Sequence, residues 1–209
     1  MSRSLIEAAL QSGLQALDLE LSAVQQSRLV DYIELLAHWN RAFNLTAITD
    51  PVEMVHRHLI DSLAVLPWIE GSLVVDAGTG AGLPGVPLAI ARPDTKFVLV
   101  DSNGKKIRFL RQVRRELGLT NIEPVQMRLE DWRPERLPAQ VVARALAPLP
   151  RLVEQTGFLL SGGAVLLAMK GRLAKEECEP LAGAYNIQPV ELNVPGAETV
   201  RKLVIVRKK

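Results

Sequence analysis

The stretch LVVDAGTGAGLPG, residues 73–85, decides the fold of this 209-residue chain. A short β-branched run ends in Asp76, and glycines follow at positions 78, 80, 82 and 85. Glycine allows the backbone at the carboxyl end of a strand to pass close to a ligand, because no side chain collides with it. A tight strand-to-helix turn without a ligand is the alternative. A strand before the loop and a helix after it favour a cofactor-binding loop.

Downstream of this loop, short β-branched runs alternate with helical stretches. Near-continuous apolar strands separated by helices are typical of a parallel sheet covered on both faces. The last two runs lie too close together for an intervening helix, so we expect them to pair antiparallel. The seven expected strands are 73–76, 96–101, 121–126, 141–144, 164–169, 187–194 and 200–207. The sequence thus predicts an α/β fold with a mostly parallel, doubly wound sheet that ends in an antiparallel hairpin.

Upstream of the loop, the sequence predicts helices only. Capping-box spacing occurs at Ser4 with Glu7 and again at Ser22 with Gln25. Asp50 followed by proline marks a third helix start, which Pro67 closes. We therefore expect an N-terminal helical extension over residues 1–70 and a sheet domain over 71–209, packed as one globular unit.

The acids around the glycine loop indicate which cofactor it binds. Asp101 ends the second strand, where a carboxylate suits the two ribose hydroxyls of either NAD or S-adenosylmethionine. Asp76 would repel a pyrophosphate but would suit the ammonium and sulfonium of S-adenosylmethionine. The D-x-G-x-G-x-G pattern resembles the first motif of class I S-adenosylmethionine-dependent methyltransferases, which are Rossmann-like. We therefore expect S-adenosylmethionine as the methyl donor.

Two further segments end strands at the same edge of the sheet. After the third strand, Glu130 or Asp131 can accept the adenine amino proton, and Leu129 can offer backbone contacts and apolar cover. A solvent-facing acidic turn is the alternative there. Arg144 ends the fourth strand and can bind guanine O6, a phosphate or the cofactor carboxylate. A salt bridge that caps the strand is its alternative role.

No general acid, general base or nucleophile is expected at this site. Amino-group methyltransferases place an Asn or Asp with Pro-Pro-aromatic after the fourth strand, which this chain lacks. Cys178, the single cysteine, lies far from this point in a polar stretch, so we expect an unreactive thiol and no thiolate metal site. A ring nitrogen such as guanine N7 needs only alignment of donor and acceptor. We therefore expect neither a catalytic residue nor a metal.

Residues 104–115, GKKIRFLRQVRR, contain six Lys or Arg and no acid. On a helical wheel the basic side chains gather opposite an apolar face, and only Lys106 departs from this pattern. A solvated charged face is the usual explanation for such a run, but no acidic i,i+4 partner neutralises it. We therefore expect phosphate contacts. The candidate RNA-binding residues are Lys105, Arg108, Arg111 and Arg115, with Lys170 at the end of the fifth strand.

The net charge of +2 conceals two regions of opposite charge. Residues 1–70 hold 4 Lys or Arg and 9 Asp or Glu, whereas residues 71–209 hold 21 and 14. Near-neutrality therefore does not exclude a nucleic-acid partner. The first residues lack the apolar core of a signal peptide, and no window approaches the ~20 apolar residues of a membrane span. We expect a cytoplasmic protein.

Six segments resemble the ribosomal RNA small subunit methyltransferase G family, also called glucose-inhibited division protein B. They are WNRAFNLTAITDP (39–51), RHLIDSL (57–63), DAGTGAGLPGVPLAI (76–90), DSNGKKIRFLRQV (101–113), ARA (143–145) and MKG (169–171). The resemblance implies a cytoplasmic methyltransferase that uses S-adenosylmethionine to methylate guanine N7 in the 530-loop region of 16S rRNA. It indicates the small ribosomal subunit as partner, with no membrane and no obligate protein partner.

The resemblance also implies which residues contact the cofactor. These are Gly78, Leu83, Leu129, Glu130 and Arg144, and Asp101 matches the ribose-binding acid of class I enzymes. His58 and Asp61 match the family as well, and we expect them to cap or pack the extension rather than to catalyse. A non-catalytic, cofactor-sensing RNA-binding or ribosome-assembly factor is the alternative function, since no acid or base is recognisable. An NAD-dependent oxidoreductase is a third candidate, which Asp76 disfavours.

Overall fold

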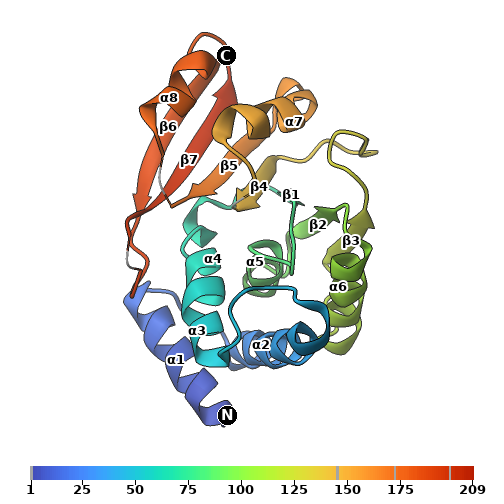
Figure 1. Ribbon diagram of the computed structural model, residues 1–209, viewed down its shortest axis with the longest axis vertical. Helices are drawn as coiled ribbons and strands as arrows, with labels where there is room; N and C mark the ends of the chain where they lie inside the picture. The colour runs from blue at the N-terminus through green and yellow to red at the C-terminus, as the bar shows by residue number, and fades with distance from the viewer. Residues whose placement is uncertain (1, 145, 172, 198) are drawn as a thin grey trace.

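The structure is a computed structural model that describes residues 2–144, 146–171, 173–197 and 199–209. Within these residues a seven-stranded sheet forms the centre of the molecule, in the order β3-β2-β1-β4-β5-β7-β6 (Figure 1). The strands are β1 (Leu73–Ala77), β2 (Lys96–Asp101), β3 (Ile122–Gln126), β4 (Gln140–Arg144), β5 (Val165–Lys170), β6 (Tyr185–Leu192) and β7 (Arg201–Lys208). Each expected strand is present, with ends shifted by two residues at most.

Pairing in the sheet is parallel from β3 to β5 and antiparallel beyond it. The prediction of a mostly parallel sheet with a terminal antiparallel pair is therefore confirmed. β7 is inserted between β5 and β6 and is antiparallel to both. The last strand along the chain thus lies inside the sheet, and β6 forms its edge.

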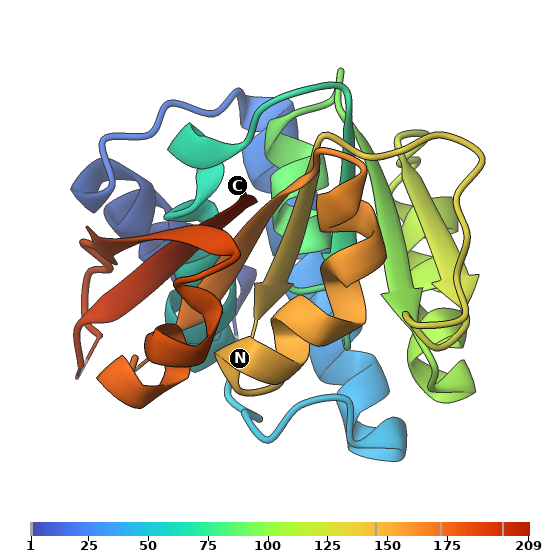
Figure 2. The same cartoon turned by 90° about the horizontal axis from the view of Figure 1, so that it is seen from above.

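Helices cover both faces of the sheet (Figure 2). One face is covered by α2 (Ala23–Phe43), α5 (Gly85–Ala91) and α6 (Gly104–Glu116), and the other by α7 (Leu149–Ser161) and α8 (Lys175–Cys178). The extension also holds α1 (Arg3–Ala16), α3 (Pro51–Met54), the π-helical segment η1 (Val55–Ile60), α4 (Asp61–Leu63) and the 3-10 turn η2 (Leu66–Trp68). A second 3-10 turn, η3 (Glu179–Leu181), follows α8.

Capping residues set two of the three expected helix starts in the extension. Ser22 and Gln25 form the expected capping box, and Asp50 accepts a hydrogen bond from the Glu53 N–H at 2.8 Å. The expected box at Ser4 is wrong, because α1 begins at Arg3 and Ser4 lies inside its first turn. The Glu7 carboxylate pairs with Arg3 at 3.0 Å instead of reaching back to the backbone.

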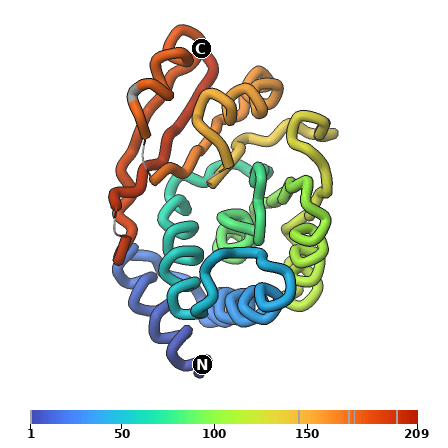
Figure 3. The backbone as a smooth tube through the Cα atoms, viewed as in Figure 1, coloured from blue at the N-terminus to red at the C-terminus, as the bar shows by residue number. Residues whose placement is uncertain are grey.

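The helical extension shares one hydrophobic core with the sheet. Apolar side chains of α1, α2 and η1 are buried together with those of α5, α6 and one sheet face. The α2 helix runs alongside α5 and α6, as the backbone trace in Figure 3 shows. Phe109 of α6 meets Tyr32 and Trp39 of α2 at ring-centroid distances of 6.3 and 5.7 Å. In the described part of the chain, no helix combines the length and apolarity that crossing a membrane requires.

Candidate functional site

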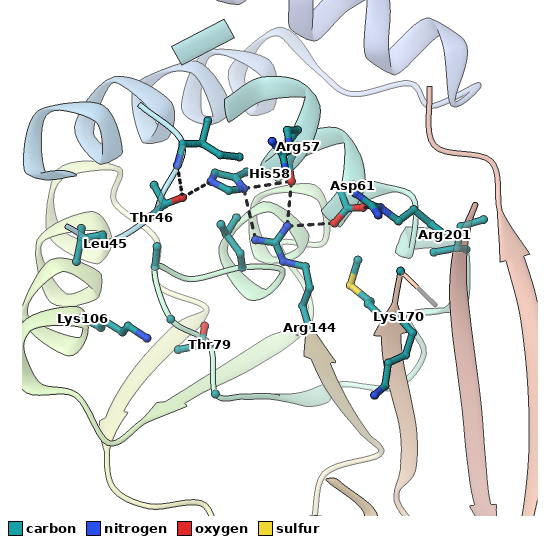
Figure 4. Close-up of a pocket in the computed structure, with 18 of the residues that line it drawn as sticks. Leu45, Thr46, Arg57, His58, Asp61, Thr79, Lys106, Arg144, Lys170 and Arg201 are labelled. Carbon is teal, nitrogen blue, oxygen red and sulfur yellow. Dashed lines mark hydrogen bonds and ion pairs between the residues drawn. The ribbon is translucent and has the colours of Figure 1, made fainter. Parts of the chain in front are cut away.

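A cavity of about 510 Å³ opens at the carboxyl ends of β1, β4 and β5 (Figure 4). Its volume lies in the range of small-molecule sites, roughly 300 to 1,000 Å³. The glycine loop forms its floor, the extension forms one wall and the C-terminal strands form another. The lining comprises Leu45, Thr46, Ile48, Arg57, His58, Asp61, Gly78, Thr79, Gly80, Ala81, Leu83, Lys106, Arg144, Met169, Lys170, Gly171, Leu192, Arg201 and Lys202.

Asp76 shapes the glycine loop from below and does not face the cavity. The side chain is fully buried, and its Oδ2 accepts hydrogen bonds from Thr79 Oγ1 at 2.6 Å and the Gly85 N–H at 2.8 Å. The expectation that Asp76 faces the cationic end of a cofactor is therefore wrong. Burial raises the pKa of Asp76 to about 6, although Thr79 and Gly85 both favour its ionised form. Its second oxygen has no hydrogen-bond partner among the described residues.

Gly78 shows why this loop needs glycine. Its backbone adopts a φ of +65°, and a Cβ atom there would stand 2.3 Å from Leu146 Cδ1. An L side chain would be strained at this φ, and the end of the Leu146 side chain would have to move aside. The loop backbone can therefore line the cavity directly, as expected from the sequence.

Tyr32, a residue that sequence reasoning missed, fixes the other end of the loop. Its hydroxyl donates a hydrogen bond to the Ala81 carbonyl at 2.9 Å, across 49 residues of sequence. The side chain is completely buried, and burial raises its pKa. The sequence does hold a signal for this role, namely a tyrosine on the apolar face of α2. A buried tyrosine hydroxyl usually needs a hydrogen-bond partner.

Asp101 lies directly behind the loop. Its Oδ2 accepts a hydrogen bond from the Gly80 N–H at 2.9 Å and its Oδ1 accepts one from the Asn103 N–H at 2.8 Å. Lys106 Nζ lies 3.5 Å from Oδ2 and points from α6 into the cavity (Figure 4). Each oxygen of a carboxylate has two acceptor positions, so Asp101 retains capacity for ribose hydroxyls. Its role in cofactor binding stays a prediction.

Leu129 and Glu130 lie apart from the other predicted cofactor residues. Leu129 is buried in the core on the α7 side of the sheet. Glu130 is exposed, and its Oε1 accepts a hydrogen bond from Gln155 Nε2 of α7 at 2.7 Å. Its own backbone N–H and Gln155 hold the pKa of Glu130 below its usual value. Neither residue lines the cavity, and Asp101 does not line it either, so the cofactor contacts of all three stay predictions.

Arg144 enters the cavity from the end of β4 and is anchored to the extension. Its Nη1 donates hydrogen bonds to the Arg57 carbonyl at 3.0 Å and to Asp61 Oδ2 at 3.1 Å. Arg201, on β7, donates from Nε to the other oxygen of Asp61 at 3.0 Å. Asp61 therefore joins the extension to the sheet, as expected, and it also lines the cavity. Ala145, in the ARA motif, lies outside the described residues.

His58 is buried beside Arg144. Thr46 Oγ1 lies 2.9 Å from its Nε2, and the Arg57 carbonyl lies 3.1 Å from its Nδ1. Burial and the Arg144 guanidinium lower the pKa of His58 to about 4. The ring is therefore neutral at physiological pH, and both of its nitrogens have partners.

The basic residues of α6 occupy its outer face. Lys105, Arg108, Arg111 and Arg115 are exposed, whereas Phe109 and the other apolar residues of this helix are buried. The expected amphipathic arrangement is confirmed, and contact with RNA stays a prediction.

Lys170 differs from those four. Its side chain is only 13% exposed. Its Nζ donates to the Ala147 carbonyl at 2.8 Å and lies 3.0 Å from Glu177 Oε2. Its ammonium would have to leave these partners to contact RNA, which also stays a prediction.

The described residues offer neither a metal-ligand cluster nor a cysteine with a lowered pKa. Among the described residues, no three His, Cys, Asp or Glu side chains gather as a metal site requires. Burial and the neighbouring Glu177 raise the pKa of the Cys178 thiol, which keeps it in its less reactive form. Sequence reasoning assigned no cavity role to Leu45, Thr46 and Arg57, although it noted their motifs. Only the tertiary fold brings these motifs to the sheet edge.

Similarity to known proteins agrees with this architecture. A family model described as rRNA small subunit methyltransferase G matches residues 25–204. "Ribosomal RNA small subunit methyltransferase G" of Legionella pneumophila (strain Corby) is 45% identical over 201 residues, covering 96% of this chain and 94% of its own.

Two solved structures share the fold at low sequence identity. Human methyltransferase 10 domain containing protein has a TM-score of 0.62 at 15% identity, covering 88% of this chain and 96% of its own. A SAM dependent methyltransferase from Aquifex aeolicus has a TM-score of 0.57 at 17% identity, covering 78% and 96%. The predicted Rossmann-like methyltransferase fold is confirmed.

Proposed function

This chain belongs to the rRNA small subunit methyltransferase G family, and we propose that it transfers a methyl group from S-adenosylmethionine to guanine N7 in the 530-loop region of 16S rRNA. The observation that carries the proposal is the glycine-floored cavity at the carboxyl edge of the sheet, into which Arg144 projects. We propose the cytoplasm as the site of the reaction, in keeping with a small-subunit rRNA substrate.

The residues of the cavity fit S-adenosylmethionine. A Cβ atom on Gly80 would meet nothing closer than Lys106 Nζ at 3.8 Å, so open space lies above the loop backbone. Asp101 holds the Gly80 N–H and keeps acceptor positions for ribose hydroxyls. Arg144 offers positive charge to the carboxylate of the amino-acid end.

The side chains that face the cavity are suited to alignment rather than to proton transfer. When bound, S-adenosylmethionine supplies an electrophilic methyl group on sulfur, and guanine N7 accepts it through its own lone pair without losing a proton. His58 has a pKa lowered to about 4 with both ring nitrogens engaged, and Asp61 is paired with two arginines. Neither is placed as a general base, so the remaining contribution is to hold donor and acceptor in line. Apolar walls from Leu45, Leu83 and Met169 help to exclude water.

Positive charge around the cavity supports an RNA substrate. Arg57, Arg201 and Lys202 lie in the walls contributed by the extension and β7. The exposed face of α6 adds the cationic row described above. Phosphate neutralisation by such groups is the main source of affinity for nucleic acids.

A transfer assay tests the proposal. Purified protein is incubated with methyl-labelled S-adenosylmethionine and small ribosomal subunits that lack the modification, and the 16S rRNA is digested and its nucleosides are separated. We expect label in 7-methylguanosine, in a fragment that contains the 530 loop. Binding of subunits without label in 16S rRNA, or label on another atom, would contradict the proposal.

A further inference from the structure

We propose that Asp61 is a positioning residue that holds Arg144 and Arg201 in the directions needed to bind the carboxylate of the methyl donor. The inference deepens the function proposed above and rests on it. It concerns how the helical extension contributes to the cofactor site, since Asp61 itself belongs to α4 and not to the sheet.

Asp61 joins three separate parts of the fold. Its carboxylate is almost completely buried and uses one oxygen for each arginine (Figure 4). Oδ2 accepts from Arg144 Nη1 at 3.1 Å, and Oδ1 accepts from Arg201 Nε at 3.0 Å. The partners lie 83 and 140 residues away along the chain. A single carboxylate therefore fixes the end of β4, the start of β7 and the extension relative to one another.

The direction of the Arg144 side chain depends on its contacts with the extension. The Arg57 carbonyl accepts a second hydrogen bond from its Nη1. All of these partners are on the extension, whereas the backbone of Arg144 belongs to the sheet. A free arginine side chain has several rotatable bonds, and fixing them costs conformational entropy. The contacts with Asp61 and Arg57 fix the side chain during folding, so ligand binding does not have to restrict it further.

The charges leave an excess of positive charge next to the glycine loop. Asp61 compensates one of its two arginines, and His58 adds no charge. Arg57, Lys106 and Lys170 have acidic partners of their own at 2.9, 3.5 and 3.0 Å, and Lys202 adds a further cation to the β7 wall. The arginine pair on Asp61 therefore retains one positive charge that faces the cavity, where an anionic carboxylate finds it already oriented.

The Asp61→Asn variant distinguishes a positioning role of Asp61 from simple electrostatic attraction between the cavity and the cofactor carboxylate. The change makes the cavity more positive, so attraction alone would tighten binding of a carboxylate. Positioning predicts the reverse, because an amide cannot hold two guanidinium groups with both of its ends. We expect the Kd of the full-length protein for S-adenosylmethionine, measured calorimetrically without RNA, to rise about tenfold. Unchanged or tighter binding would overturn the inference.

A double-mutant cycle shows whether Asp61 acts through Arg144. Asp61→Asn is measured in the wild type and in an Arg144→Gln background, and we expect its effect on the Kd to shrink in the second to the smaller part that acts through Arg201. A tenfold loss that persists in the Arg144→Gln background would mean a general structural role and would overturn the inference.

Two further variants keep the test valid if Asp61→Asn folds poorly. Arg201→Gln removes the excess charge of the arginine pair while leaving Asp61 with Arg144, and we expect the Kd to rise several-fold; an unchanged Kd would overturn the inference. Glu123→Gln is the control, because it also removes a carboxylate from an ion pair, here an exposed one with Lys96 outside the cavity lining. Its Kd should stay within twofold of wild type, and a loss equal to that of Asp61→Asn would also overturn it.

The transfer assay separates this inference from the proposed function. We expect Asp61→Asn to raise the KM for S-adenosylmethionine far more than the KM for small subunits. If the wild type transfers no methyl group to 16S rRNA, the proposed function fails. If the wild type is active and Asp61→Asn has the wild-type KM for S-adenosylmethionine, only the positioning role fails.

Discussion

Asp76 combines full burial with a carboxylate oxygen that has no partner among the described residues. Burial raises its pKa from 3.8 to about 6, so between these values the folded protein binds more protons than the unfolded chain. Its contribution to the free energy of unfolding is therefore present below about pH 4 and is lost as the pH rises through 6. At about 1.4 kcal/mol for each unit of pKa, the loss is about 3 kcal/mol.

Asp76→Asn removes this dependence, because an amide keeps the shape of the protonated acid. Its Oδ1 can still accept from Thr79 and Gly85, as Asp76 Oδ2 does. We expect the free energy of unfolding of the variant to gain about 3 kcal/mol relative to wild type between pH 4 and pH 7. Urea unfolding of both proteins at the two pH values measures it, and a constant difference would show that the charge is not penalised.

Single residues also show where prediction from sequence stops. Gly78, Leu83 and Arg144 were expected at the cofactor site and do line the cavity. Asp76 was expected to face the ligand, but its position at a strand end does not reveal that its side chain turns down toward Gly85. Arg144 was correctly placed at the sheet edge. Its partner Asp61 could not be identified, because the two are brought together only by the docking of the extension.

At the level of elements, the exposed arginines of α6 lead to a prediction about the salt dependence of small-subunit binding. The triple variant Arg108→Gln, Arg111→Gln and Arg115→Gln removes three exposed cations without touching the cavity. We expect weaker binding of small subunits and a log Kd–log salt slope that is reduced by about 2 to 3, since each phosphate contact contributes about 0.7 to 0.9. The Kd for S-adenosylmethionine should not change.

A matched control for that variant removes three exposed arginines elsewhere, namely Arg136, Arg151 and Arg207. Subunit binding and its slope are measured by filter retention between low and physiological salt. An equal reduction in both triple variants would mean that α6 has no special role and that net charge alone governs binding.

The secondary-structure elements were predicted from the sequence better than their order in the sheet. Alternation of apolar strands with helices gave every strand, because burial on both faces leaves a direct signal in the sequence. The insertion of β7 between β5 and β6 leaves no such signal, since either strand of a close pair can join the sheet. The π-helical segment η1 was also missed, because its register depends on tertiary contacts of the extension.

At the scale of the whole molecule, the shared core predicts a single unfolding transition. Trp39 reports on α2, and Trp132 reports on the segment after β3, on the opposite face of the sheet. We compare two variants whose only tryptophan is Trp39 or Trp132, so that Trp68 is replaced in both. We expect the urea midpoints of their tryptophan fluorescence to coincide within error. A lower midpoint at Trp39 would show that the extension unfolds separately.

The same core predicts that residues 71–209 do not fold alone. Without α2, the buried faces of α5 and α6 would be exposed, and the Ala81 carbonyl would lose Tyr32. We expect this fragment to lack the near-ultraviolet circular dichroism of the full chain. A fragment with native signal and S-adenosylmethionine binding would show that the extension is dispensable for folding.

The inner position of β7 has a consequence for protein synthesis. Chains grow from the amino end, so β1 to β5 leave the ribosome while the outer edge of β5 still lacks its neighbour. An uncovered strand edge is a template for wrong pairing, and here it persists until the last strand arrives. Arg201 is the first residue of that strand, and with it comes the second arginine on Asp61. A growing chain therefore gains the neighbour of β5 and the second arginine of the cavity wall in the same step.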